Sequence, residues 1–207
     1  MPVRIKDSVI VTGSVMVNND YYINHFQGEG KNIKKFLENT LGRRIRYHCD
    51  ENKENTLTLA AKAVDILLDN QKISGEDIDF IIFSSQYPEF TVPSQACIIH
   101  NHIKGKDKCF TLDINSNCLG MLRGLDVINR YFNDKKGEIK KALLIGSDYM
   151  SIHTKDNEVV TYSSLSDGAC VLLLEYTKEE DIGVIGSSNR TITKEAYGCF
   201  FSRMWNV

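Results

Sequence analysis

Cys118 is the residue of this sequence best placed for nucleophilic chemistry. It lies in the stretch DINSNCLG (113–120), between a run typical of a strand and a run typical of a helix. Backbone N–H groups and the dipole at the start of a helix stabilise a thiolate, and they can hold the oxyanion formed when sulfur attacks an acyl group. The alternative is inert packing, because cysteine is among the most buried residue types.

No histidine stands in a pattern that marks a general base for this sulfur. His100 and His102 lie two positions apart on a predicted helix, so they point to different faces, and this spacing is poor for a metal pair. The six cysteines are scattered singly without a CxxC pair, which argues against a zinc site. We therefore expect no metal site and no bound cofactor.

The composition excludes several classes of partner. The chain has 25 Lys+Arg and 27 Asp+Glu, a balance that argues against nucleic-acid binding or a polybasic membrane anchor. No apolar run reaches the roughly 18 residues of a membrane span. The N-terminus enters a strand pattern directly and lacks the features of a signal peptide. We expect a cytoplasmic protein with reduced thiols.

The elements that would position Cys118 alternate between strand and helix patterns. Strand patterns lie at 3–17 (a strand or a hairpin), 78–86, 108–114, 140–148, 169–176 and 182–188. Helix patterns lie at 32–42, 54–71, 94–103 and 118–132. This alternation predicts an α/β protein with a layered mixed β-sheet and flanking helices, in which the last two strands form an antiparallel edge.

Several segments together resemble one known family. DINSNCLGMLRGLDVI (113–128) resembles the nucleophile segment of the β-ketoacyl-acyl carrier protein synthase III family of the thiolase superfamily. Other segments resemble that family in order along the chain: LGRRIR (41–46), TLAAKAVDILLDNQKISGEDIDFIIFSS (58–85), VPSQACIIHNHI (92–103), ALLIGSDYMS (142–151) and SDGACVLLL (166–174). Six such segments in the right order and spacing are a specific signal.

The resemblance implies a thiolase-like half. Residues 1–207 would form the N-terminal domain with the nucleophile, and the C-terminal half would be absent from this chain. Cys118 would take an acyl group from acyl-CoA or acyl-ACP, and malonyl-ACP would then decarboxylate and attack it in fatty acid or related biosynthesis. The family's catalytic His and Asn come from the second half, so this chain alone is expected to be inactive in condensation. The implied partners are acyl carrier protein, a second copy in a homodimer, and a separate subunit supplying the C-terminal half.

The resemblance also assigns substrate-binding positions. Phe36 and Thr40 fall where the family clamps the coenzyme A adenine between a Trp and an Arg, and Ile152 falls on a second family arginine. Both cations are lost here, which favours an acyl-carrier-protein donor. Phe36 either stacks on the donor or packs within an amphipathic helix. Val92 falls where the family often has a Phe that lines the partner's acyl pocket, so it would leave room for a longer or branched acyl chain.

Two other functions stay open at this point. A non-catalytic binding or assembly subunit would keep the fold without turnover, and the lost cations and the missing His and Asn favour it. A cysteine-dependent acyl hydrolase would release free acid without condensation.

Overall fold

A five-stranded sheet organises the larger part of the chain. The computed structural model describes residues 3–135, 138–179, 182–184, 186–188, 190 and 191, and the strand order is β1-β7-β6-β4-β5. These strands are β1 (Val3–Thr12), β4 (Phe80–Ser84), β5 (Phe110–Ile114), β6 (Lys141–Asp148) and β7 (Gly168–Tyr176). β4 pairs in parallel with β5 and β6, whereas β7 is antiparallel to β6. The predicted mixed sheet is therefore confirmed.

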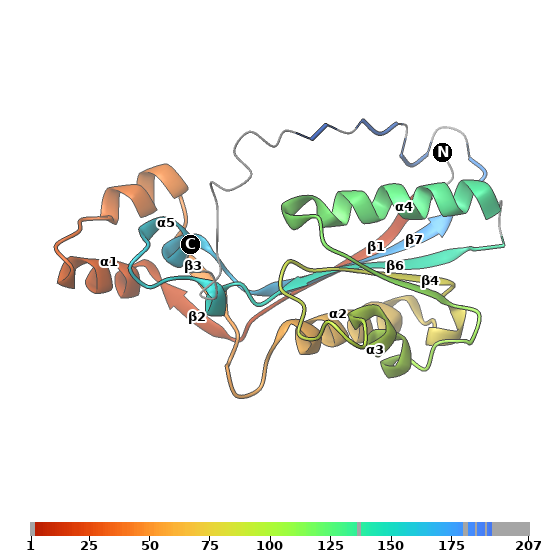
Figure 1. Ribbon diagram of the computed structural model, residues 1–207, viewed down its shortest axis with the longest axis horizontal. Helices are drawn as coiled ribbons and strands as arrows, with labels where there is room; N and C mark the ends of the chain where they lie inside the picture. The colour runs from red at the N-terminus through yellow and green to blue at the C-terminus, as the bar shows by residue number, and fades with distance from the viewer. Residues whose placement is uncertain (1–2, 136–137, 180–181, 185, 189, 192–207) are drawn as a thin grey trace. The chain divides into compact units, whose positions relative to one another are not determined.

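Helices cover both faces of this sheet (Figure 1). α2 (Thr56–Gln71) contacts β6 and β7, and α3 (Gln95–His102) contacts β4 and β5. α4 (Gly120–Lys135) packs on β4 and β6 from the opposite face. Asn55 begins α2 because its side chain accepts a hydrogen bond from the Thr58 amide at 2.8 Å.

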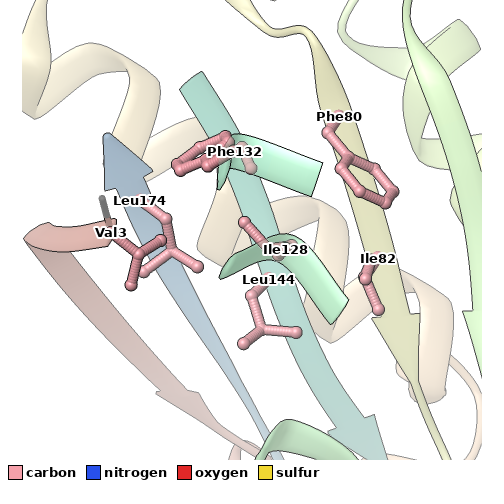
Figure 2. Packing of buried hydrophobic residues seen from close by; sticks show 8 residues of the cluster. Val3, Phe80, Ile82, Ile128, Phe132, Leu144 and Leu174 are labelled. Atoms are coloured by element: carbon pink, nitrogen blue, oxygen red, sulfur yellow. The ribbon is translucent and has the colours of Figure 1, made fainter. Parts of the chain in front are cut away.

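The core beneath α4 contains the side chains drawn in Figure 2. Ile128 and Phe132 of α4 pack with Phe80 of β4 and Leu144 of β6, and all four are fully buried. One turn before Ile128, Gly124 lets the helix approach the sheet closely. A Cβ atom at Gly124 would lie 2.4 Å from Leu144 Cδ1.

The chain divides into two compact units. The larger unit contains the five-stranded sheet and is built from residues 3–11, Asn55–Asp148 and the described residues between 168 and 188. The smaller unit contains Thr12–Glu54 and Tyr149–Asp167. The larger unit is therefore assembled from three separate stretches of sequence.

The smaller unit is built on a two-stranded antiparallel ribbon. β2 (Val15–Asn18) pairs with β3 (Ile45–His48), with Val15 opposite His48. Its other elements are α1 (Asn19–Gly28), a π-helical turn η1 (Phe36–Leu41), a 3₁₀ turn η4 (Ser151–His153) and α5 (Val159–Ser164). Its apolar cluster contains Tyr22, Phe26, Ile33 and Leu37.

Arg46 of β3 is buried in this unit, with 1% of its surface exposed. Its Nε donates a hydrogen bond to the Ser163 carbonyl at 2.6 Å, and its Nη1 donates to Asn19 Oδ1. The guanidinium also lies over the Tyr22 ring, 5.1 Å from the centroid. These contacts replace part of the water that a charged group loses on burial, while the buried Nη2 makes no hydrogen bond within the described residues.

Most of the predicted elements are confirmed, and a few predictions are wrong. Residues 3–17 form two strands in different sheets, so they are not a hairpin. The strand predicted at 182–188 is wrong, because 182–184 and 186–188 are not in a strand; residue 185 lies outside the described residues. The sheet position beside β7 is taken by β1 instead. α1 lies in a segment for which no helix pattern is given by the sequence.

Candidate active site

Cys118 lies exposed at the junction between β5 and α4. It is the middle residue of a single 3₁₀ turn, η3 (Asn117–Leu119), and α4 begins directly after it at Gly120. The alternative that this cysteine is packed in the core is therefore wrong. Exposure is what a nucleophile requires, although exposure alone does not assign that role.

The turn is formed where three parallel strands end together. Ser84 of β4 is in register with Ile114 of β5 and with Gly146 of β6. The residues that follow each strand therefore emerge at one edge of the sheet. α3 and α4 connect these strands over opposite faces, and the carboxyl edge at such a reversal is where open α/β sheets bind ligands.

The Asp148 carboxylate fixes the loop that follows β4. Its Oδ1 accepts hydrogen bonds from Ser85 Oγ at 2.7 Å, from the Gln86 amide at 2.8 Å and from the Tyr87 amide at 3.2 Å. Asp148 is not singled out by the sequence pattern. Asp148 ends a buried strand at the same edge of the sheet as the residues around Cys118. This position is the signal that could have identified it.

The first turn of α4 lies close against β4. A Cβ atom at Gly120 would be 1.8 Å from Ser84 Oγ, so a glycine is needed for this approach. The Leu119 amide donates to the Ser116 carbonyl at 3.1 Å, and the Gly120 amide donates to the Asn117 carbonyl. These two amides are thus used within the turn, whereas the Cys118 amide donates no hydrogen bond within the described part of the chain.

Two other cysteines are poorer nucleophiles than an exposed thiol. Burial raises the pKa of Cys109 to about 11, and burial also raises the pKa of Cys170. A raised pKa lowers the fraction of reactive thiolate at neutral pH. Cys97 is exposed, but its Sγ is hydrogen-bonded to Thr111 Oγ1 at 3.2 Å.

The predicted substrate-binding residues fall in different parts of the chain. Val92 belongs to the larger unit and is 84% exposed in the segment between β4 and α3. Phe36 and Thr40 share η1 of the smaller unit; Phe36 packs against the apolar cluster of that unit, and Thr40 is exposed. Ile152 lies in η4 of the same unit and is half exposed. The packing of Phe36 favours the core interpretation, and the binding role of all four stays a prediction.

A buried polar network ties together the smaller unit. The Tyr22 hydroxyl and His48 Nε2 are hydrogen-bonded at 3.0 Å, and burial lowers the pKa of His48 while Asp167 partly raises it. The Asp167 carboxylate accepts hydrogen bonds from the Cys49 amide at 2.9 Å and from Ser151 Oγ at 2.6 Å. These contacts join distant segments of this unit, which is a structural role.

His100 and His102 have separate partners, as their spacing predicted. His100 Nε2 is hydrogen-bonded to the Lys106 carbonyl at 3.0 Å, and His102 Nε2 to Asp65 at 2.8 Å. Over the described ranges, no group of three His, Cys, Asp or Glu side chains is arranged to hold a metal ion. None of the helices described is long and apolar enough to cross a membrane.

Comparison with known proteins identifies relatives of this chain. The family model of 3-oxoacyl-[acyl-carrier-protein (ACP)] synthase III matches residues 112–192, a range that includes Cys118 and Asp148. A β-ketoacyl-[acyl-carrier-protein] synthase III of Ehrlichia canis is 30% identical over 141 residues, which are 68% of this chain and 43% of that protein. A synthase III of Staphylococcus epidermidis is 33% identical over 170 residues, 82% of this chain and 49% of that protein.

Comparison with solved structures finds proteins whose fold is similar to that of this chain. The 3-oxoacyl-(acyl-carrier protein) synthase of Burkholderia xenovorans superposes with a TM-score of 0.76 at 25% identity, covering 86% of this chain and 50% of that protein. The predicted thiolase-like arrangement of a mixed sheet and flanking helices is therefore confirmed. The chain spans about half the length of the curated relatives that it matches.

Proposed function

Since this chain is related to the 3-oxoacyl-[acyl-carrier-protein] synthase III family and spans about half the length of its curated members, we propose that it carries the nucleophile of a condensing acyltransferase. The observation that carries the proposal is the exposed Cys118 at the carboxyl edge of the parallel strands, inside the matched segment. Residues 1–207 act in this proposal as an N-terminal thiolase-like domain.

The first step is acyl transfer to the sulfur. The Cys118 thiolate attacks the carbonyl carbon of an acyl thioester, and a new carbon–sulfur bond forms while the bond to the carrier sulfur breaks. The carrier leaves as a thiolate and takes up the proton that Cys118 released. The Cys118 amide is available to hold the oxyanion of the tetrahedral intermediate.

Condensation is a second step in this proposal, and it also needs groups that the family supplies from its second half. A malonyl group on acyl carrier protein loses carbon dioxide, and the resulting carbanion attacks the acyl-enzyme. In the family a His and an Asn of the second half support that step. We expect the chain by itself to become acylated without decarboxylating malonyl-ACP, and a separate C-terminal-half subunit would restore condensation.

Intact-protein mass spectrometry tests the first step. The chain is incubated with acetyl-CoA and with acetyl-ACP, and we expect one acetyl adduct that is absent from Cys118→Ala and present in the matched control Cys97→Ala. The ACP donor should react faster, because Thr40 and Ile152 supply no cation for the coenzyme A phosphates. No adduct from any donor would refute acyl transfer and favour the non-catalytic assembly subunit. Release of free acetate without malonyl-ACP would instead favour the acyl hydrolase.

The lost cations at Thr40 and Ile152 are the observation that favours the assembly subunit as a second candidate. Such a subunit would bind acyl carrier protein or a related chain and would not turn over. It would bind a partner equally well after Cys118→Ala, a result that a binding measurement by calorimetry would detect.

The proposal includes a homodimer. β5 is an edge strand of the sheet, and Phe110 on it is 42% exposed, so a second copy could extend the sheet there. Light scattering should give twice the chain mass of 23.5 kDa, and Phe110→Asp should lower that mass toward the monomer. A monomer at micromolar concentration would refute this part of the proposal.

A further inference from the structure

Asn115 joins two segments at the carboxyl edge of the sheet. Its Oδ1 accepts a hydrogen bond from the Asn117 amide at 3.1 Å, and its Nδ2 donates to the Gln86 carbonyl at 3.3 Å. Gln86 is itself held by its amide, which donates to the Asp148 carboxylate at 2.8 Å. A continuous series of hydrogen bonds thus runs from the end of β6, through the loop after β4, to the turn that carries Cys118.

The backbone at Asn117 explains why this series matters. Asn117 has a φ of 50°, in the left-handed region that residues with a Cβ rarely adopt. Among the described residues, only Lys72, Lys104 and Asn117 are non-glycine residues with positive φ, and Asn117 immediately precedes Cys118. Asparagine adopts this conformation more readily than other residues with a Cβ, but it still costs free energy, and the hydrogen bond from the Asn117 amide to the Asn115 side chain is a contact that can offset this cost.

We propose that Asn115 is a positioning residue of η3, the turn that carries Cys118. The side-chain amide of Asn115 fixes the left-handed conformation of Asn117, and it thereby fixes the direction in which the Cys118 sulfur points. The inference rests on the proposed acyl transfer for its functional meaning. Its geometric part, that Asn115 holds the turn, is testable without any acyl donor.

Three variants distinguish what each of the two hydrogen bonds and the positive φ of Asn117 contribute to holding the turn. Asn115→Ala removes both bonds, whereas Asn115→Asp keeps an acceptor for the Asn117 amide and loses the donor to Gln86. Asn117→Gly adopts positive φ without steric cost, so it needs less support. Asn133→Ala is the matched control, because Asn133 is an exposed asparagine within α4, beyond the turn.

The functional measurement is single-turnover acylation of Cys118 by S-acetyl-N-acetylcysteamine. Asn115→Ala should lower the maximal acylation rate by roughly three- to tenfold, the effect of one or two hydrogen bonds, with an unchanged half-saturating thioester concentration. Asn115→Asp should retain more of the rate than Asn115→Ala. The double variant Asn115→Ala/Asn117→Gly should return to within about twofold of the parent, which a general loss of stability would not allow.

Amide hydrogen exchange separates failure of this inference from failure of the proposed function. Asn115→Ala should speed exchange of the Asn117 amide by at least about threefold, because that amide loses its acceptor, while Asn133→Ala leaves it unchanged. If the parent takes up no acetyl group, the proposed function fails, and the exchange measurement alone decides the positioning role. Unchanged exchange at Asn117 in Asn115→Ala, or an acylation rate that Asn117→Gly does not rescue, would overturn the inference.

Discussion

Gly124→Ala tests the close packing of α4 on the sheet. The substitution adds a methyl group within a helix, which by helix propensity alone would stabilise the protein by about 1 kcal/mol. Against this gain, the new Cβ would lie 2.4 Å from Leu144 Cδ1 and 3.3 Å from both Ile114 Cδ1 and Ile82 Cγ2. Carbon atoms prefer separations of about 3.5–4.0 Å, and forcing extra volume into a packed core costs about 1–3 kcal/mol.

The steric cost should exceed the gain, because Leu144 and Ile82 are fully buried and have little room to move (Figure 2). We therefore expect a steric cost in the upper part of that range, about 2–3 kcal/mol, which after the gain of about 1 kcal/mol lowers the free energy of unfolding by about 1–2 kcal/mol. With a slope of about 2 kcal/mol/M, this is a fall of about 0.5–1 M in the urea midpoint, measured by circular dichroism.

A double variant identifies the cause of the loss. Leu144→Val removes the Cδ1 atom and by itself should cost about 1 kcal/mol. Gly124→Ala/Leu144→Val should be more stable than the sum of the single losses by at least about 1 kcal/mol. Gly28→Ala is the control, because a Cβ at Gly28 would contact nothing within 4 Å, and we expect no loss there. A Gly124→Ala protein as stable as the parent, or additive losses in the double variant, would refute this reasoning.

Three further predictions concern other parts of the two units. Burial lowers the pKa of His48 in the folded state. Below about pH 6.5 the unfolded chain therefore binds more protons than the folded chain, and the free energy of unfolding falls as the pH falls. The difference between the urea midpoints at about pH 7.5 and 5.5 should be smaller in His48→Gln than in the parent protein. Arg46→Lys should lower the free energy of unfolding by about 2–3 kcal/mol, because an ammonium group lacks the several N–H donors of the planar guanidinium, one of which binds the Ser163 carbonyl. An unchanged melting temperature would contradict this. Asn55→Ala should cost about 1 kcal/mol by removing the acceptor for the Thr58 amide, whereas Asn55→Asp should retain most of the stability in the same urea titration.

The elements with strong apolar patterns could be predicted from the sequence. The runs at 78–86, 108–114 and 140–148 became β4, β5 and β6, because strands covered on both faces read as continuous apolar segments. α2 was predicted from its stripe at helical spacing, and Asn55 supplies the cap at its start. In these segments, local pattern and tertiary packing favour the same structure.

The remaining features depend on contacts that the pattern does not encode. β3 contains Arg46, and a buried arginine in a strand cannot be anticipated without Tyr22, Asn19 and Ser163, which come from distant segments. The run at 182–188 has the composition of a strand, but the place beside β7 is occupied by β1. The strand propensity of this run is overridden because both sides of its expected partner β7 are already paired, with β1 and with β6.

The candidate site was predicted in part. Cys118 was found because it stands between a buried strand and a long helix, and its exposure agrees with the proposed role. Asn115 and Asp148 were not assigned roles, because their importance comes from hydrogen bonds to the loop at Gln86. Examining together the polar residues that follow each parallel strand would have brought both into consideration.

The placement of β7 between β1 and β6 has a consequence for synthesis on the ribosome. β1 ends at Thr12, yet its neighbour β7 begins only at Gly168. At translation speeds of about 5–20 residues per second, the N-terminal strand waits roughly 8 to 30 s for that neighbour. Once β6 has been made, both β1 and β6 lack their pairing with β7 until Tyr176 is added, so the nascent chain should depend on chaperones most strongly while residues 149–176 are made.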